Sequence, residues 1–352
     1  MSLQPAGVFS QSYARDKAMF KTWKQVAALG LFLLFLISLP MTLGARYVAI
    51  GNVMLITAVV VVGLQLTTGL AGQINLGQSA FMGVGAYAAA ILAGKAGLPM
   101  LVTIPLGGLA AAIFGAIFGL GAVRIKGFYL ALTTIAAHFI FHFAIINLPG
   151  DWVGGSQGLR LGRADLFGFE FGTDTSMYYL LLAVTAIMVA GAYGILRSRH
   201  GRAFVAVRDD DVAAGLIGIN VTRTKATAFF VGAFYAGVGG ALWAYFVRFV
   251  QVDQFTLFFS IWYIGMIIVG GLGSIPGALV GVFVVRGAQE ALVAFAPSLT
   301  NIVPQLGGDV VFAGLNILLG GIIALFLLFE PRGLMHRWNI LKRAYRVWPY
   351  PY

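Results

Sequence analysis

The chain has 352 residues, of which 60% are hydrophobic and only 10% charged, and its mean hydropathy of +0.91 lies far above that of soluble proteins. The formal net charge is +11, but the basic residues stand at the ends of apolar runs, as in membrane proteins, so nucleic acid is excluded as a partner. The chain contains no cysteine, which excludes disulfides and thiolate metal sites.

Long apolar runs predict an all-α polytopic membrane protein. A helix of about 20 apolar residues crosses the roughly 30 Å hydrocarbon layer, whereas a β-barrel would show short alternating segments. The runs predict about ten spans. They lie near residues 27–43, 48–68, 77–94, 98–121, 127–147, 177–196, 226–247, 257–272, 276–296 and 310–329.

Charges between the spans predict the orientation of the chain. Residues 1–26 form a cytoplasmic, uncleaved N-terminal segment, residues 27–329 the transmembrane domain, and residues 330–352 a basic cytoplasmic tail. The loop 200–225 is basic and expected on the cytoplasmic side, while the loop 148–176 carries more acids and suits the outer, periplasmic face. Ten spans with both termini inside satisfy these assignments.

The span order indicates a weak inverted repeat. One group of four spans follows the first span and another follows the sixth, so the two groups have opposite orientation. Glycine-rich turns lie at 69–85 and 269–281, although one span out of correspondence, and interrupted segments in inverted repeats point to a transport pathway. The alternative is that these glycines only allow close helix packing, as expected for Gly115 and Gly119.

The first glycine-rich turn carries uncharged polar side chains that lipid would not tolerate. It reads LTTGLAGQINLGQSAFMGVGAY, residues 66–87, and protein or a water-filled path must receive it. Neutral amides and hydroxyls can pass a zwitterion without trapping it. We therefore expect Gln73, Asn75, Gln78 and Ser79 to line the substrate pathway.

Two further polar features lie between residues 127 and 253. His138 and His142 share a helical face, but no nearby acid or cysteine completes a metal site, so hydrogen bonding inside the bundle is expected and no metal. On the outer face, three arginines are candidates for docking a binding protein, with local pairing to Asp151, Asp165 and Asp253 as the alternative. They are Arg160, Arg163 and Arg248.

The loop 200–225 predicts a short capped helix. Asp209 and Asp210 are expected to cap a helix from about Asp211 to Ile217, which ends at Gly218 or Asn220 in a left-handed turn. Its exposed apolar face is expected to comprise Val212, Ala213, Ala214 and Leu216. Such a face with a charged rim suits docking in a partner's groove, and the alternative is an ordinary solvated connector.

Charged residues inside a span are costly and usually paired or functional. Arg286 and Glu290 are four apart in the 276–296 segment and therefore share a helical face. We expect a structural ion pair, because an acid that relays protons would more typically lack an adjacent arginine.

Two long motifs give the chain a family resemblance. GLAGQINLGQSAFMGVGAYAAAIL and RSRHGRAFVAVRDDDVAAGLIGINVTRTKATAFFVGAFYAGVGGALWA resemble the permeases of branched-chain (hydrophobic) amino acid ABC importers, the longer LivM-type subunit in particular. GSIPGALVG and FEPRGL fit the same family. The resemblance covers roughly residues 45–335.

The resemblance implies a type II ABC importer-like permease of the bacterial inner membrane. Its partners would be a LivH-like permease subunit, two LivG/LivF-like ATPases and a periplasmic binding protein. VAAGLIG, residues 212–218, resembles the coupling motif of such importers, with Val212 in place of the usual acid. The residues implied in coupling to the ATPases are Arg208, Asp209, Asp210, Asp211, Ala213, Ala214 and Gly218.

The chain itself is expected to be non-catalytic and without a cofactor. It lacks the GxxxxGK[ST] motif, so ATP and Mg²⁺ are expected in the partner subunits. Related importers carry urea, amides or aromatic acids, which stay alternatives. So does an ion-coupled secondary transporter, which predicts an unpaired acid within a span. A membrane enzyme or scaffold lacks support, because the four histidines are dispersed.

Overall fold

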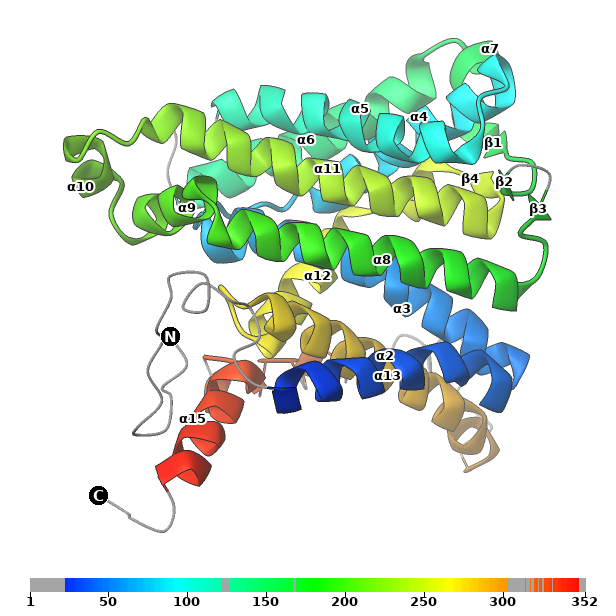
Figure 1. Ribbon diagram of the computed structural model, residues 1–352. Coiled ribbons are helices and arrows are strands. Elements are labelled where there is room, and N and C mark those ends of the chain that lie inside the picture. Colours follow the sequence, from blue (N-terminus) through cyan, green and yellow to red (C-terminus); the bar gives the residue numbers. More distant parts are fainter. Residues whose placement is uncertain are drawn as a thin grey trace.

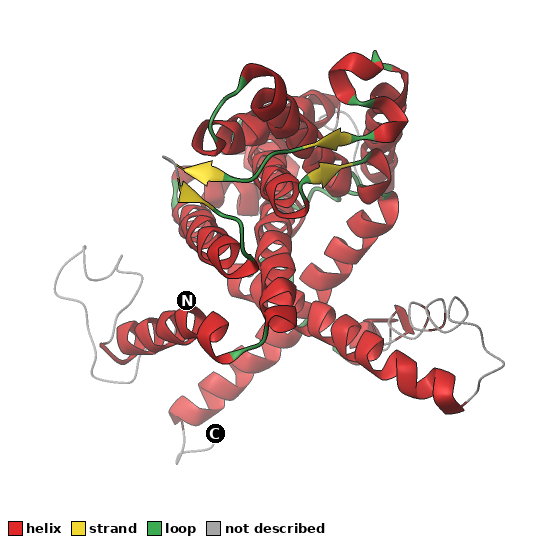
Figure 2. Ribbon diagram, turned by 90° about the vertical axis from the view of Figure 1, so that its right-hand side faces the viewer, coloured by secondary structure: helices red, strands yellow, loops and turns green. Residues whose placement is uncertain are grey.

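The protein is a bundle of long helices in a computed structural model that describes residues 23–121, 127–166, 169–302, 314, 317, 320, 321, 323, 324, 326–330 and 332–347 (Figure 1). The described strands form only two antiparallel pairs of two residues each, at one end of the bundle (Figure 2). The predicted all-α polytopic class is confirmed.

The long helices follow the apolar runs. They are α2 (Trp23–Thr42), α3 (Ala45–Leu64), α4 (Gln78–Ala96), α5 (Met100–Gly121), α6 (Phe128–Asn147), α8 (Asp174–Arg197), α11 (Val221–Val247), α12 (Leu257–Gly270) and α13 (Ile275–Ile302). The helix α3 continues as the π-helical turn η1 (Gln65–Leu70).

Short elements lie at both ends of the bundle, and the two ends are called the loop end and the strand end. At the loop end are α9 (Arg199–Asp209), α10 (Asp211–Leu216) and α15 (Leu334–Val347); at the strand end are α7 (Gly150–Val153), η2 (Gly155–Gln157), β1 (Leu159–Arg160), β2 (Asp165–Leu166), β3 (Phe169–Glu170), β4 (Phe249–Val250) and η3 (Val252–Gln254). The strand β1 pairs with β4, and β2 pairs with β3.

Eight helical stretches among the described residues are long and apolar enough to cross a membrane, and they match the second to ninth predicted spans. The first predicted span, 27–43, forms α2, whose apolar part Val26–Thr42 is shorter. The tenth, 310–329, lies largely outside the described residues, as do most of the N-terminal segment and the end of the C-terminal tail.

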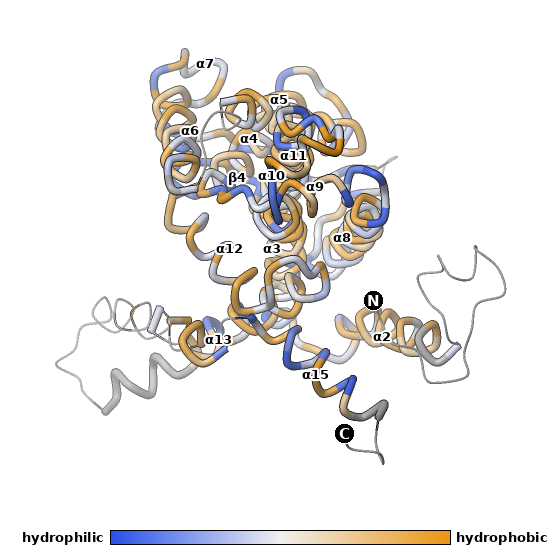
Figure 3. The backbone as a smooth tube through the Cα atoms, turned by 90° about the vertical axis from the view of Figure 1, so that its left-hand side faces the viewer, coloured by the Kyte–Doolittle hydropathy of each residue, from blue (hydrophilic) through white to orange (hydrophobic). Residues whose placement is uncertain are grey.

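The helix α11 is the centre of the bundle and packs on α3, α4 and α5. Glycines make this possible, because α11 meets α4 where Gly85 faces the backbone of Gly237. The close helix packing expected at Gly115 and Gly119 is also present, because these glycines face Ala233 and Phe229 of α11. By contrast, α2 and α15 project away from this bundle, and α13 projects from it at one end although it packs on α3 and α12 (Figures 2 and 3).

The helix directions fit the predicted inversion but not the predicted pairing of the glycine turns. The first helices of the two groups, α3 and α11, run in opposite directions (Figure 1). However, α3 and α12 both run toward the loop end, so the turns that follow them lie side by side. An inversion would place equivalent turns at opposite ends, and the two glycine-rich turns are therefore not counterparts in the repeat.

Candidate functional site

The first glycine-rich turn breaks a helix inside its span. Beyond η1 the chain loses helical form over residues 71–77, with Gly72 at φ +68°, and turns back along α3. It returns as far as Gln78, whose Nε2 donates to the carbonyl of Val60 at 2.9 Å. Ten helical residues separate Val60 from Leu70, or about 15 Å. The helix α4 therefore begins deep within the bundle.

The four predicted pathway residues are all buried in protein. Asn75 and Gln78 have no exposed surface, and Gln73 is 6% exposed. Asn75 Nδ2 donates to Gln78 Oε1 at 2.8 Å, and the amide N–H of Ser79 donates to Ser260 Oγ of α12 at 2.9 Å. Protein thus satisfies most of the polar groups, as backbone away from water requires. A role in solute passage stays a prediction.

The second glycine-rich turn, residues 271–274, is tied to the first by one side chain. Gln65 Nε2, in η1, donates to the carbonyls of Gly271 and Ser274, both at 3.0 Å. Gly271 and Gly273 have φ of +117° and +80°, values that favour glycine. The two turns therefore form one polar junction at the loop end of the bundle.

The short helix predicted in the loop is present as α10. Asp210 Oδ1 accepts from the amides of Val212 and Ala213 at 2.9 and 3.0 Å, and Gly218, at φ +88°, ends the turn that follows. Asp209 does not share the capping role predicted for it, because its carboxylate pairs with Arg208 at 2.8 Å.

The exposed face of α10 differs from the prediction at one residue. Val212 and Leu216 are 65% and 84% exposed, and Ala213 is also exposed, whereas Ala214 is only 2% exposed. The helix α10 packs on α9 and α11, so Ala214 does not belong to its exposed face as predicted; its role in coupling to an ATPase stays a prediction. Ile217, 76% exposed, extends the apolar face instead.

Arg208 connects this loop to both glycine turns. Its Nη1 donates to the carbonyl of Gly69 at 3.1 Å, and its Nε and Nη2 donate to Asp209 Oδ1. A Cβ placed on Gly72 would lie 2.7 Å from Arg208 Cγ, and one on Gly273 would lie 3.1 Å from Nη1. The arginine therefore lies against both turns.

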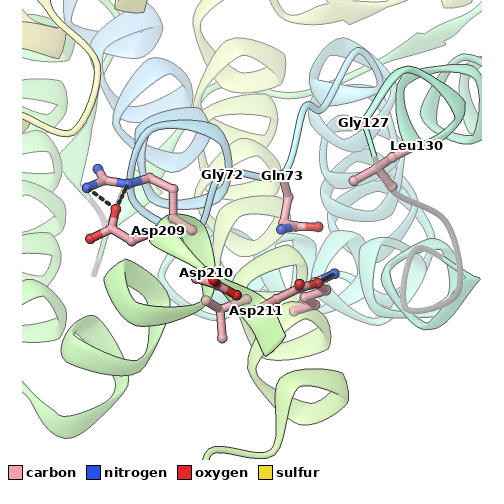
Figure 4. Close-up of a pocket in the computed structure, with 10 residues that line it drawn as sticks. Gly72, Gln73, Gly127, Leu130, Asp209, Asp210 and Asp211 are labelled. Carbon is pink, nitrogen blue, oxygen red and sulfur yellow. Dashed lines mark hydrogen bonds and ion pairs between the residues drawn. The ribbon is translucent and has the colours of Figure 1, made fainter. Parts of the chain in front are cut away.

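A buried ion pair that the sequence did not predict fixes α10 to α11. Lys225 Nζ lies 3.2 Å from Asp211 Oδ2, and the lysine side chain is only 3% exposed. A pocket of about 350 Å³ opens beside the pair, between Gly72 and Gln73 on one side and Asp209 to Asp211 on the other (Figure 4). No regular spacing links positions 211 and 225, so the sequence predicted Lys225 only as one of the basic residues of the loop 200–225.

Replacing Lys225 with methionine should loosen α10. A hydrogen bond between charged groups contributes about 1.5–3 kcal/mol, so the amides of α10 should lose protection against hydrogen exchange by an opening free energy of that order. Exchange measured by mass spectrometry on the purified protein checks this. Arg223→Met, an exposed position one half-turn away, is the control, and equal exchange in both variants would contradict the prediction.

Residues 46–320 match the sequence family described as branched-chain amino acid transport system / permease component. The chain belongs to this family. The match covers the broken helix, the loop with α9 and α10, and the second glycine turn. No solved structure is significantly similar to the chain.

Curated relatives of this permease include both kinds of subunit. The high-affinity branched-chain amino acid transport permease LivM of Escherichia coli is 28% identical over 338 residues, which covers 89% of this chain and 76% of that protein. LivH of E. coli is 27% identical over 289 residues (71% and 82%), and BraD of Pseudomonas aeruginosa is 27% identical over 311 residues (81% and 93%).

The three arginines predicted to dock a binding protein lie in β1, between β1 and β2, and just before β4, and these strands are at the strand end of the permease (Figure 1). Arg160, in β1, is exposed. Arg163 pairs with Glu170 at 2.9 Å, not with the acids weighed above, and both side chains are more than half exposed. Arg248 Nη2 donates to the carbonyl of Gly172 at 3.0 Å. Docking stays a prediction, and an exposed pair of this kind adds little stability.

The ion pair predicted inside the ninth span is not formed. Arg286 donates instead to Gln289 Oε1 and Thr57 Oγ1, at 3.1 and 3.3 Å. Spacing alone predicted the pair, but α13 packs on α3, and the hydroxyl of Thr57 in α3 accepts from the guanidinium in place of Glu290.

His138, which is 5% exposed, lacks the hydrogen bond expected inside the bundle, because its Nδ1 has no partner within the described chain. The described residues contain no cluster of three metal-ligating side chains.

Proposed function

We propose that this chain is the membrane-spanning permease subunit of an ATP-driven importer that carries hydrophobic, branched-chain amino acids into the cytoplasm. Family membership supports the class of protein and of solute. The observation that carries the mechanism is the contact of Arg208 with the carbonyl of Gly69, since it links the loop to the broken helix. The chain is a multi-pass membrane protein and a permease subunit, so catalysis is assigned to other subunits.

The ATPases would act on the permease through α10. An ATPase that grips the exposed Val212, Leu216 and Ile217 would pull α10, and the pair between Asp211 and Lys225 would pass the motion to α11. Arg208 and Gly218 would act at the two ends of this lever. The Gln73 to Ser79 segment would then rearrange and admit solute, because its hydrogen bonds to α3 and α12 depend on helix positions.

The partners follow from the family. Similarity to both LivM and LivH supports a pair of permease subunits in the membrane. Two LivG/LivF-like ATPases, which bind ATP and Mg²⁺, would dock at the loop end, and a periplasmic binding protein would dock at the strand end near Arg160, Arg163 and Arg248. The basic loop supports an orientation in which the loop end and both termini face the cytoplasm of a bacterium and the strand end lies outside the inner membrane.

A second function has one observation in its favour. An ion-coupled secondary transporter requires an unpaired acid within a span, and Glu290 forms no ion pair with Arg286. Importers of urea, amides or aromatic acids stay alternatives for the solute.

Reconstitution tests these functions. The chain is purified with its encoded partner permease and ATPases, placed in proteoliposomes, and assayed with labelled leucine and the binding protein. We expect uptake that requires ATP and the binding protein. Uptake by the chain alone under an ion gradient would show a secondary transporter, and ATP-driven uptake of urea, amides or aromatic acids without leucine would show a different solute.

A further inference from the structure

Two opposite charges stand inside a span without neutralising each other. Arg286 and Glu290 lie within Ile275–Ala294, a stretch of α13 long and apolar enough to cross the membrane. Charges at this depth are costly and are rarely kept without a function. Thr57, which accepts from Arg286, lies in the middle of the spanning stretch Ala45–Leu70. The guanidinium is therefore near the bilayer centre.

The arginine has only neutral partners in the part of the chain that the structure describes. Its two hydrogen bonds to described residues go to the side-chain oxygens of Gln289 and Thr57, and its Nε is buried without a hydrogen-bond acceptor. Arg286 can therefore still donate to a carboxylate, whose two oxygens match the geometry of the guanidinium.

Among the described residues, no cation neutralises Glu290. Its carboxylate has no hydrogen bond or ion pair with any of them, and its side chain is partly exposed. Residues four apart on a helix have Cβ atoms about 5–6 Å apart, so the two charges are neighbours on one face. Phe283, one turn before Arg286 on that face, is 69% exposed.

We propose that Arg286 and Glu290 together contact the zwitterionic head of the transported amino acid. The guanidinium would receive the α-carboxylate, Glu290 would receive the α-ammonium, and Phe283 would offer an apolar surface to the side chain. An α-amino acid carries both an ammonium and a carboxylate on one carbon, so a single solute bound at this face of α13 would meet both charges. This inference rests on the proposed function, and it assigns a solute contact to α13 in addition to the broken helix.

The test uses the whole importer with its ATPases and loaded binding protein. Maximal leucine uptake, ATP turnover stimulated by the binding protein, and assembly with the partner permease are measured for R286Q, E290Q and the control R343Q, an exposed arginine of α15. We expect R286Q and E290Q to lower uptake about tenfold or more, because each loses a charged hydrogen bond to solute, with ATP turnover and assembly unchanged.

A protection assay gives a second measurement. The chain has no cysteine, so Val293→Cys adds a single thiol one turn from Glu290. Leucine should slow its labelling by a membrane-permeant thiol reagent several-fold, whereas leucinamide and 4-methylpentanoate, which lack the carboxylate and the ammonium, should not. Adding R286Q should remove the protection.

Three outcomes would overturn the inference. The first is wild-type uptake in both variants, and the second is equal protection by all three solutes. The third is a variant that loses both uptake and assembly with the partner permease, because the two charges would then hold the subunits together. A wild-type importer that carries no amino acid would instead refute the proposed function.

Discussion

Arg208→Glu should abolish coupled uptake while ATP turnover continues. The substitution removes the donor to Gly69 O and places a carboxylate beside both that carbonyl and Asp209. Each lost hydrogen bond of a charged group is worth about 1.5–3 kcal/mol, and the new repulsion adds to it, so uptake should fall by at least about a hundredfold. Leucine uptake and ATP hydrolysis measured on the same proteoliposomes check this.

Arg202→Glu is the matched control. Arg202 is exposed on the same helix, α9, and among the described residues its guanidinium donates to the carbonyl of Arg197 alone. A charge reversal there alters the same loop by the same amount without touching a glycine turn. Equal uptake in the Arg208 and Arg202 variants would show that the contact with Gly69 carries no motion.

Gly240→Ala should have the largest effect on stability. A Cβ at this position of α11 would collide with the carbonyl oxygen of Met82 and lie 3.0 Å from the amide nitrogen of Ala86. These are backbone atoms, which cannot move aside as a side-chain end can, so α4 and α11 must separate. We expect a loss of about 3 kcal/mol or more in the free energy of unfolding.

Gly94→Ala provides the comparison in the same pair of helices. Gly94 lies in α4 with no atom within 4 Å of an added Cβ, so alanine should be neutral or stabilise by up to about 1 kcal/mol. Thermal unfolding of the detergent-solubilised protein measures both variants. Equal melting temperatures would show that the contact at Met82 relaxes without cost.

Local features of the site could be predicted from the sequence, and distant contacts could not. The cap at Asp210 and the glycine stop at Gly218 depend on neighbours within a few residues, and both predictions are confirmed. The contact of Arg208 with Gly69 spans 139 residues, and that of Gln65 with Gly271 spans 206. No periodicity indicates such contacts, because they depend on how helices pack.

The errors have the same origin. A spacing of four predicted a pair between Arg286 and Glu290, but a hydroxyl of another helix, Thr57, competes for the guanidinium. The composition of α10 predicted an exposed Ala214, but a six-residue helix lying on its neighbours must bury one side. Apolar length, by contrast, is a property of each segment alone, and the second to ninth spans were therefore predictable.

The early start of α4 affects the biogenesis of the protein. Gln78 and Ser79 form hydrogen bonds with Gly232 and Ser260, which the ribosome adds 154 and 181 residues later. At about 5–20 residues per second this delay is roughly 8–36 seconds, during which the nascent segment needs other partners for its polar groups. The insertion machinery must therefore shelter residues 71–79 until α11 and α12 emerge.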